Sequence, residues 1–550
     1  MGSKGQSRKN LRKQSKRNQS TPLKSYSFFN NFKLFNPGEK VFSIISILTL
    51  SFIFATIYLT IFDEKVDLNG DNLNYYYLAK NVSERGIYSL YYDHLQKPHG
   101  HFPPGYPFLL SIFMKISQSV NFIKAINGFL LLASSITLYF TFRRFGLGKF
   151  IAFTGAFMVL YNASFLSFST IMMSEIPFVF FSTFTIYLIS ISDFNKPFYK
   201  NPTYIIAVIL LYYTFLIRSQ GIALLPGVIL FLILTRRWVY ILGTIVVFGI
   251  VSIPWNIRNS LAGGGSSYLN QLLMKNPYWV EEGRVSMTDL LSRVINNSQR
   301  YIDKELPVSI VNNLQVVYSG EGYVQWTYWW IGLIIIILTV IGLIAIKNNR
   351  SMLFGYIAGT FGVLLLWPDV WFSNRFILPI IPFIAVAVIH GIKVCMELLM
   401  KWTFKQNPGF NTLLLVPLIV FLNKDGVENL KIKAQQKTYP PAYQNYFNLA
   451  NWAKNNLNPD NTVIIARKPE LFHHFSAIHT ASFSRTPDES ALLDGLKRVG
   501  ATHVVVDQLG YADTGRYLLP VVQNNPGLFT VIHKTGEPET YLIRFNTPIQ

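Results

Sequence analysis

The feature that most constrains this chain is a series of apolar runs separated by short basic turns. The first run, Val41–Phe62, is about as long as an α-helix must be to cross the hydrocarbon core of a bilayer. Residues 1–40 precede it with ten Lys or Arg and one acid, a net charge of +9. Positive charge before a first span is typical of a cytoplasmic N-terminus. Residues 1–40 are therefore predicted to be a basic cytoplasmic tail.

Carrying this orientation along the chain predicts about 11 spans. They are 41–62, 122–142, 150–173, 176–191, 203–217, 221–235, 239–255, 326–346, 352–367, 376–399 and 410–422. Basic residues occupy the turns that this alternation places inside, as the positive-inside rule requires; these are Arg143 and Arg144, Lys196 and Lys200, Arg236 and Arg237, Lys347 and Arg350, and Lys401 and Lys405.

Two long outer loops follow from the same alternation, at 63–120 and 256–325. The apolar run 106–116 within the first loop is only about half a membrane thick. We therefore expect it to form a juxtamembrane or re-entrant helix. The membrane domain as a whole is predicted to occupy residues 41–422.

Composition excludes several classes of protein. Half of the 550 residues are hydrophobic and 14% are charged, against about 25% charged in soluble globular chains. The net charge of +21 could indicate a nucleic-acid partner. Most of it lies in the tail and the inner turns, so we assign it to membrane orientation and anionic membrane lipids and expect no nucleic-acid partner. Cys395 is the only cysteine, so no intrachain disulfide is possible.

Residues 423–550 have the composition of a soluble domain. Tyr446–Leu457 reads as an amphipathic helix, Thr462–Ala466 and His503–Val506 as buried strands, and Phe529–Arg544 as a hairpin. The predicted fold class is a polytopic α-helical membrane protein of about 11 spans with a small C-terminal extracytoplasmic α/β domain.

Acidic residues at the outer face are the first candidates for chemistry. Asp71 and Tyr75 stand four residues apart, on one face of a helix. Glu175 lies at the outer tip between two spans, where an acid is costly unless it is paired or hydrated. Solvated surface acids, or a helix-start acid before Pro177 that the helix dipole favours, are the alternative interpretations.

Three arginines lie at outer span ends, where the positive-inside rule makes them less expected: Arg218, Arg258 and Arg375. The planar guanidinium suits phosphate because it can donate two parallel hydrogen bonds. Each arginine alone could instead pair with an acid or reach toward lipid headgroups. Three arginines and two acids on one side, beside two long loops, favour a site for an anionic ligand.

Histidines suggest a metal only weakly. His99 and His101 are close together, but no third ligand is identifiable. We keep His101 as a candidate substrate-binding residue, assign no metal ligand, and leave a divalent metal open. His473, His474 and His479 in the C-terminal domain are interpreted as ordinary surface or core residues. No phosphate-binding loop, dinucleotide fingerprint or G-x-S-x-G elbow is present, so no cofactor is identified.

The motifs GDNLNYYYLAKNVSERGIYS, PPGYPFLL, MSEIPF, IPWNIRN and NRFILPIIPF occur in this order along residues 41–400. In this order the chain resembles the C-type (GT-C) membrane glycosyltransferases, specifically the superfamily of protein O-mannosyltransferases and lipid A aminoarabinose transferases. The resemblance implies a polyprenyl-phosphate sugar donor, inversion of the anomeric centre and reaction at the outer membrane surface.

The family's first-loop acid and tyrosine map to Asp71 and Tyr75. Asn72 stands where a second acid is common, which leaves Asp67 or Asp63 as alternative bases. The resemblance implies that the first-loop acid accepts the proton of an acceptor hydroxyl.

The family's second acid maps to Glu175, with an implied role in positioning the acceptor or the sugar. Its Pro-Trp-x-x-Arg-Asn motif maps to Arg258 and Asn259, and its late arginine maps to Arg375. These arginines are expected to stabilise the phosphate of the leaving polyprenyl group.

The function expected from the sequence is transfer of a sugar from a polyprenyl-phosphate donor to an acceptor hydroxyl of a lipid, glycan or protein. The resemblance places the protein in a bacterial inner membrane. A transporter or flippase of a lipid-linked sugar is the alternative. It is less favoured because the large loops and the extra domain lie on one side and no inverted-repeat pair of broken spans is evident. A non-enzymatic scaffold is a third and weaker alternative.

Overall fold

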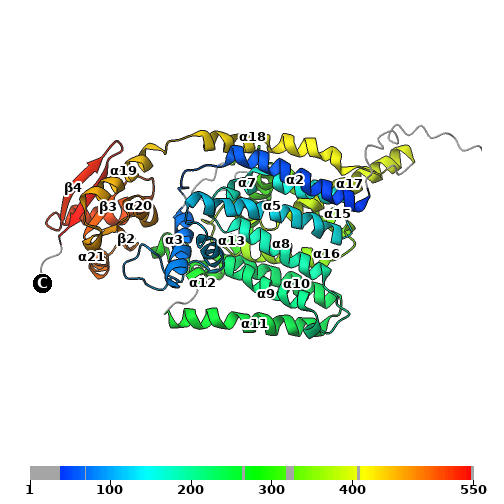
Figure 1. The fold of residues 1–550 in the computed structure, drawn as a ribbon, viewed down its shortest axis with the longest axis horizontal. Helices are drawn as coiled ribbons and strands as arrows, with labels where there is room; N and C mark the ends of the chain where they lie inside the picture. Colours follow the sequence, from blue (N-terminus) through cyan, green and yellow to red (C-terminus); the bar gives the residue numbers. More distant parts are fainter. Residues whose placement is uncertain (1–37, 69, 263–266, 317–326, 406–408, 547–550) are drawn as a thin grey trace, which may run out of the picture.

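The computed structural model describes residues 38–68, 70–262, 267–316, 327–405 and 409–546. Nearly all of the tail predicted at 1–40 therefore lies outside the described residues. So do 263–266 and 317–325 of the second outer loop. The described part consists of a bundle of helices and a small mixed α/β domain at one end of it (Figure 1).

The chain is an integral membrane protein with several long apolar helices. Four helices are long and apolar enough to cross a membrane singly: α2 (Glu39–Ile61), α5 (Val120–Arg144), α11 (Trp238–Leu261) and α17 (Ile381–Phe404). A fifth span can be formed by α6 (Lys149–Leu160) and α7 (Ala163–Ser169), which are bent by 57°. The bend lies at Asn162, whose side-chain oxygen caps α7 by accepting from the N–H of Ser164.

The other expected spans overlap helices as well. These helices are α8 (Glu175–Ile191), α9 (Pro202–Ile217), η2 and α10 (Ser219–Ala223 and Leu224–Leu234), α15 (Trp329–Ala345), α16 (Arg350–Leu364) and α18 (Val416–Gln435), although α18 begins six residues after the start of the expected span 410–422 and runs on beyond its end. Most of these are too short to meet the same length test, so the total of about 11 spans stays a prediction. The apolar run 106–116 forms α4 (Gly105–Met114), whose ten residues extend only about 15 Å.

Both outer loops carry helices. The first contains α3 (Gly70–Arg85) as well as α4. The second, expected as a long polar loop, contains α12 (Ser267–Leu272), α13 (Met287–Arg300), η4 (Tyr301–Glu305) and α14 (Leu306–Ile310). Helix α13 starts at a capping box in which Ser286 and Asp289 bond reciprocally.

The C-terminal domain contains a five-stranded sheet, which confirms the predicted small α/β domain. Its strands are β1 (Val463–Ile465), β2 (His479–Ala481), β3 (His503–Val506), β4 (Phe529–Thr535) and β5 (Thr540–Phe545), in the order β2-β1-β3-β5-β4. The first three are parallel, and β3, β5 and β4 pair antiparallel. Its helices are α19 (Pro441–Asn456), α20 (Pro469–Ser476), α21 (Glu489–Arg498) and α22 (Leu519–Asn524).

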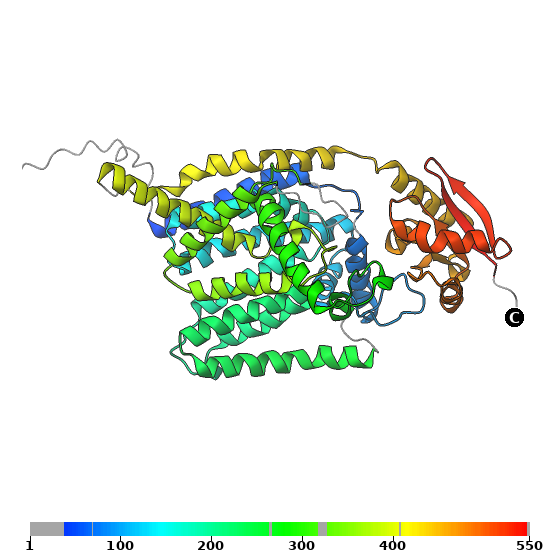
Figure 2. The same ribbon diagram turned by 180° about the vertical axis from the view of Figure 1, so that it is seen from behind.

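The C-terminal domain packs directly on the first outer loop. Figures 1 and 2 place it beyond α3, with α18 running along the bundle toward it. The Tyr77 hydroxyl of α3 lies 3.1 Å from Nδ1 of His474, and its ring packs edge-on against His473. The N–H of Thr480 donates to the carbonyl of Tyr92 at 3.2 Å. One apolar core containing Leu73 and Phe472 spans this contact. The domain is therefore held in a fixed place above the ends of the membrane helices.

Candidate active site

A cavity of about 640 Å³ lies where the membrane helices, the outer loops and the C-terminal domain meet. Its wall combines charged and aromatic side chains. Five of the seven candidate residues line it: Asp71, Tyr75, His101, Arg218 and Arg375.

Two arginines and two acids form the charged centre of the cavity. Nη1 of Arg218 lies 2.7 Å from Oε1 of Glu175, and Nε of Arg375 lies 3.5 Å from the same oxygen. Nη2 of Arg375 lies 3.8 Å from Oδ2 of Asp71. Arg375 therefore connects the two acids, and the four charges hold one another in place.

Glu175 occupies a different position from the one expected. Its side chain is 0% exposed, behind Arg218 and Arg375, whereas the side chain of Asp71 is 37% exposed. A fully buried carboxylate cannot contact the acceptor or the sugar directly in this arrangement. The carboxylate of Glu175 contacts the guanidiniums of Arg218 and Arg375, and its expected role in positioning the acceptor or the sugar stays a prediction.

Tyr75 and Ser174 complete this centre. Oγ of Ser174 lies 3.2 Å from the hydroxyl of Tyr75 and accepts from Nη1 of Arg218 at 3.2 Å. Asp71 stands in the first turn of α3, where a negative charge is favoured by the helix dipole. Tyr75 follows one turn later, and both residues line the cavity, as the i, i+4 spacing predicts.

The backbone around Arg218 is shaped by two glycines. The chain leaves α9 in an extended conformation at Arg218, with φ −146° and ψ 134°. A Cβ at Gly221 would lie 2.6 Å from main-chain atoms of Thr214 and Phe215. A Cβ at Gly105 would lie 2.6 Å from the main-chain carbon of Leu216. The PPGYP segment is thus a structural corner that packs against the end of α9.

A buried amide ties the two arginine-bearing segments together. Gln220 lies two residues after Arg218, and its Nε2 donates to the carbonyl of Phe376 at 2.7 Å. Phe376 follows Arg375 within η5 (Asn374–Phe376). The relative position of the two guanidiniums is therefore set by the main chain.

Arg258 does not line the cavity. Its Nη1 donates to the carbonyl of His99 at 2.6 Å and its Nη2 to the carbonyl of Tyr88 at 2.9 Å. Its guanidinium also lies over the rings of Tyr88 and Trp255. These contacts hold Arg258 against the first outer loop, beside the segment that bears His101, and the phosphate role expected for it stays a prediction.

Both histidines of that segment are largely uncharged at neutral pH. Burial lowers the pKa of His99 to about 3, and its Nε2 accepts from the N–H of Phe102 at 3.0 Å. Burial also lowers the pKa of His101, with a smaller opposing effect from Asp71 and a further lowering by Arg485. His101 can therefore offer the cavity a neutral ring.

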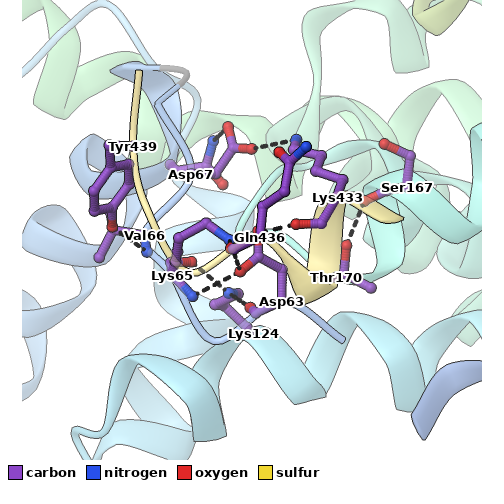
Figure 3. Close-up of polar contacts among 11 residues, drawn as sticks. Asp63, Lys65, Val66, Asp67, Lys124, Ser167, Thr170, Lys433, Gln436 and Tyr439 are labelled. Carbon is purple, nitrogen blue, oxygen red and sulfur yellow. Dashed lines mark hydrogen bonds and ion pairs between the residues drawn. The ribbon is translucent and has the colours of Figure 1, made fainter. Parts of the chain in front are cut away.

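Asp63 and Asp67, the alternative bases, belong to a separate cluster (Figure 3). Oδ1 of Asp63 lies 2.9 Å from Nζ of Lys65, and Oδ2 of Asp67 lies 3.5 Å from Nζ of Lys433. Lys124 donates to the main-chain carbonyls of Asp63 and Lys65. Neither acid is among the residues that line the cavity. The cluster instead joins the exit of α2 to the end of α18.

The described residues do not offer a ligand set for a divalent cation. No group of three or more His, Cys, Asp or Glu in this part of the chain could hold a metal ion. Asp71 and Glu175 are paired with arginines. Asn72, at the position of the family's second acid, is fully buried and donates to Oδ1 of Asp67 at 3.3 Å. A hard cation prefers several oxygen ligands, so the arrangement does not fit one.

Sequence reasoning missed the aromatic wall of the cavity. Its members come from the second outer loop and from the segment around Arg375: Tyr278, Trp279, Trp367, Trp371 and Phe376. Helix α13 supports both parts, because buried Arg293 donates to the carbonyl of Leu272 at 2.7 Å and Asn297 donates to that of Trp367 at 2.9 Å. The aromatic residues of WPDVWFSNR, so close to Arg375, were the available signal.

Residues of the C-terminal domain were missed as well. Arg467, Lys468, Arg485, Tyr511 and Asp513 line the outer half of the cavity. They lie in turns after strands, where binding residues concentrate. Only the position of the sheet above the cavity distinguishes them from ordinary surface charges.

Comparison with known proteins agrees with this architecture. A family model described as dolichyl-phosphate-mannose-protein mannosyltransferase matches residues 101–255. ArnT from Cupriavidus metallidurans, solved with undecaprenyl phosphate, superposes with a TM-score of 0.56 at 10% identity; the match covers 90% of this chain and 97% of ArnT. No curated protein sequence matches the chain significantly.

Archaeal oligosaccharyltransferases are similar too. The Archaeoglobus fulgidus enzyme, solved with a tethered acceptor peptide, has a TM-score of 0.54 at 12% identity, covering 91% of this chain and 74% of that protein. The enzyme AglB from the same organism, solved with an inhibitory peptide and dolichol-phosphate, has a TM-score of 0.52 at 13% identity, with coverages of 84% and 69%.

The chain shares its fold with solved membrane glycosyltransferases of the C type, and a mannosyltransferase family model matches part of its membrane domain. The resemblance to this superfamily, inferred from the five motifs, is confirmed by the mannosyltransferase family match and by the shared fold.

Proposed function

We propose that the protein transfers a sugar from a polyprenyl-phosphate donor to an acceptor hydroxyl at the outer face of the membrane. The observation that carries the proposal is the meeting of Asp71, Arg218 and Arg375 in one cavity at the ends of the membrane helices. A partly exposed acid beside two guanidiniums provides a base and a phosphate site for one reaction.

The similar proteins support the choice of donor. ArnT has been solved with undecaprenyl phosphate and AglB with dolichol-phosphate, both polyprenyl-type phosphates. In this chain Arg218 and Arg375 hold the donor phosphate. Their guanidiniums are oriented before the substrate arrives, because Glu175 binds both of them. The aromatic wall receives the sugar, since aromatic faces pack against the apolar face of a pyranose.

The transfer is a single displacement. Asp71 takes the proton of the acceptor hydroxyl while the hydroxyl oxygen forms a bond to the anomeric carbon. The bond between that carbon and the phosphate oxygen breaks, and the polyprenyl phosphate leaves with the electron pair. Arg218 and Arg375 stabilise the negative charge that grows on the phosphate. Attack opposite the leaving group inverts the anomeric centre.

The proposed location is the inner membrane of a bacterium, with the N-terminus in the cytoplasm and the C-terminal domain outside. The basic inner turns and the fold support this orientation. The acceptor is a lipid, a glycan or a protein.

Turnover in detergent tests the proposal against a transporter. Purified full-length protein is mixed with an undecaprenyl-phosphate hexose and an envelope extract as acceptor, and released undecaprenyl phosphate is quantified. The reaction should proceed without a sealed membrane or a membrane potential. Absence of release in detergent, together with movement of the intact donor across sealed vesicles, would contradict the proposal and favour the transporter.

A further inference from the structure

The outer half of the cavity is formed by one edge of the C-terminal sheet. Arg467 and Lys468 follow β1, Arg485 follows β2, and the segment Tyr511–Asp513 follows β3. These three strands are parallel, so their carboxyl ends meet at the same edge. Ligands of parallel sheets bind at this kind of edge, because the loops that leave the strands converge there.

Among the residues of this edge that line the cavity, positive charges outnumber negative ones. Nε of Arg467 and Nε of Arg485 each lie 2.8 Å from Oδ2 of Asp513. One carboxylate thus faces two guanidiniums, and Lys468 adds a third positive charge. The Tyr511 ring lies under both Arg467 and Lys468, 4.5 and 4.8 Å from its centroid. The ring and the shared carboxylate fix the direction of the charged groups.

The donor phosphate does not explain this basic edge. A polyprenyl tail holds its phosphate at the membrane surface, at the level of Arg218 and Arg375 on the helix ends. Arg467, Lys468 and Arg485 instead belong to the domain beyond the bundle (Figures 1 and 2). A ligand that reaches them must enter from the aqueous side.

The basic edge and the candidate base, Asp71, line the same cavity. The imidazole of His101 lies in the cavity and is influenced electrostatically by both Asp71 and Arg485. Arg485, His101 and Asp71 therefore face one cavity of about 640 Å³, which a single ligand can occupy.

Aromatic rings continue the site on its other side. The Arg485 guanidinium lies 6.0 Å from the centroid of the Tyr278 ring, and that of Arg516 lies 5.1 Å from the centroid of the Trp279 ring. Arg516 also pairs with Glu281. These contacts join the second outer loop to the C-terminal domain. The combination of cations with aromatic faces suits a carbohydrate that bears an acidic group.

We propose that the carboxyl-end edge of the C-terminal sheet, defined by Arg467, Lys468 and Arg485, binds an acidic carbohydrate acceptor through its phosphate or carboxylate groups. Its role as an acceptor site rests on the proposed function, whereas binding of the acidic carbohydrate does not.

Polymer binding without any donor tests this proposal. Full-length protein in nanodiscs of phosphatidylcholine is titrated with poly(glycerol phosphate), polygalacturonate and dextran of equal length, by biolayer interferometry. At least one anionic polymer should bind about tenfold more tightly than dextran, with an affinity that falls as salt rises. The two anionic polymers separate phosphate from carboxylate recognition.

The matched variants are Lys468→Ala with Arg485→Gln at the edge, and Lys497→Ala with Arg498→Gln at the end of α21, outside the cavity. Both pairs remove two positive charges from the same domain. The edge pair should weaken binding by about tenfold and the α21 pair by less than about twofold.

Equal affinity for dextran, or equal losses in the two pairs, would overturn the proposal. The proposal would also be overturned if an anionic polymer bound the edge variant and the wild type with equal affinity, with both proteins folded and monodisperse. Polymer binding by a chain that releases no undecaprenyl phosphate would contradict the proposed function but not this site.

Discussion

Glu175 shows how a carboxylate at the edge of a membrane can be tolerated. It is the first residue of α8, where the helix dipole favours an acid, and it also binds two arginines. The two interpretations of this residue from sequence, helix start and functional charge, are therefore compatible. Removal of its charge would take the carboxylate away from Arg218, whose side chain is 12% exposed, and would leave Arg375 with Asp71 as its acidic neighbour.

Glu175→Gln should accordingly lower both stability and transfer. We expect a loss of about 3 kcal/mol in stability, because breaking a buried ion pair leaves uncompensated charge. The control is Glu39→Gln, which removes a partner of Arg143 from a pair whose acid is 64% exposed. Surface pairs contribute about 0–1 kcal/mol, so this variant should unfold almost like the wild type. Thermal unfolding in detergent measures both. Similar unfolding temperatures for the two variants would refute the role given to Glu175.

At the residue scale, membrane topology guided which arginines could be selected from the sequence. Arg218 and Arg375 stood out because they break the positive-inside pattern, and both line the cavity. Arg258 broke the same pattern, yet its guanidinium is bound to carbonyls of the first outer loop. Nothing in the sequence distinguishes an arginine that will face a cavity from one that will fix a loop. Packing alone decides this.

At the scale of elements, the junction between α9 and η2 leaves no room for a Cβ at Gly221. Gly221→Ala would bring a methyl group to within 2.6 Å of main-chain atoms of α9. Because main chain cannot rotate away as a side chain can, we expect displacement of Arg218, a lower unfolding temperature and a large loss of donor binding. Gly249→Ala in α11, with nothing within 4 Å of the added Cβ, is the matched control. It should be neutral or slightly stabilising. The account of this junction is wrong if donor affinity is equal in the two variants.

The contact between α3 and α20 should depend on pH through His473. Burial lowers the pKa of His473 to about 4 from its ordinary value of 6.5. Between these values the unfolded chain binds the proton and the folded chain does not. The free energy of unfolding is therefore unaffected by His473 above about pH 6.5 and falls as the pH drops from 6.5 to 4. The loss reaches about 2 kcal/mol at pH 5.

His473→Gln isolates this effect, since glutamine does not titrate. Glu470 changes the stability in the opposite direction as the pH falls. Burial raises its pKa to about 7, so the folded state binds its proton more tightly than the unfolded chain does. Unfolding temperatures measured from pH 7.5 to 5 should fall more steeply for the wild type than for His473→Gln. Parallel curves for the two proteins would show that His473 does not contribute.

Most elements could be predicted from the sequence, and the exceptions have physical reasons. The apolar runs became helices because a bilayer leaves the backbone few alternatives. Strand β2 was missed because its three residues, His479–Ala481, carry no apolar pattern. The second outer loop was expected to be a long polar loop, and α13 was missed because it buries the polar side chains of Arg293 and Asn297 and exposes the apolar ones of Met287, Leu291 and Ile295. These buried polar side chains bond to main chain that only the folded structure brings near.

For the whole molecule, the net charge of +21 is chiefly a matter of orientation. The turns expected on the inner side are basic, and the proposed orientation places the cavity on the opposite side. Cys395 is the sole cysteine, so its replacement by serine gives a background for single-cysteine labelling. In right-side-out vesicles, an impermeant maleimide should label a Lys497→Cys chain at once and a Lys347→Cys chain only after permeabilisation. The reverse pattern would contradict the orientation.

The central claim is that Asp71 is the base of a glycosyl transfer. The most direct measurement is single-turnover release of undecaprenyl phosphate by Asp71→Asn, with Asp63→Asn and Asp67→Asn as controls from the neighbouring cluster. Asp71→Asn should slow release at least about 100-fold without weakening donor binding, while the controls stay within about threefold of the wild type. Release at the wild-type rate by Asp71→Asn, or a loss confined to Asp67→Asn, would contradict the claim.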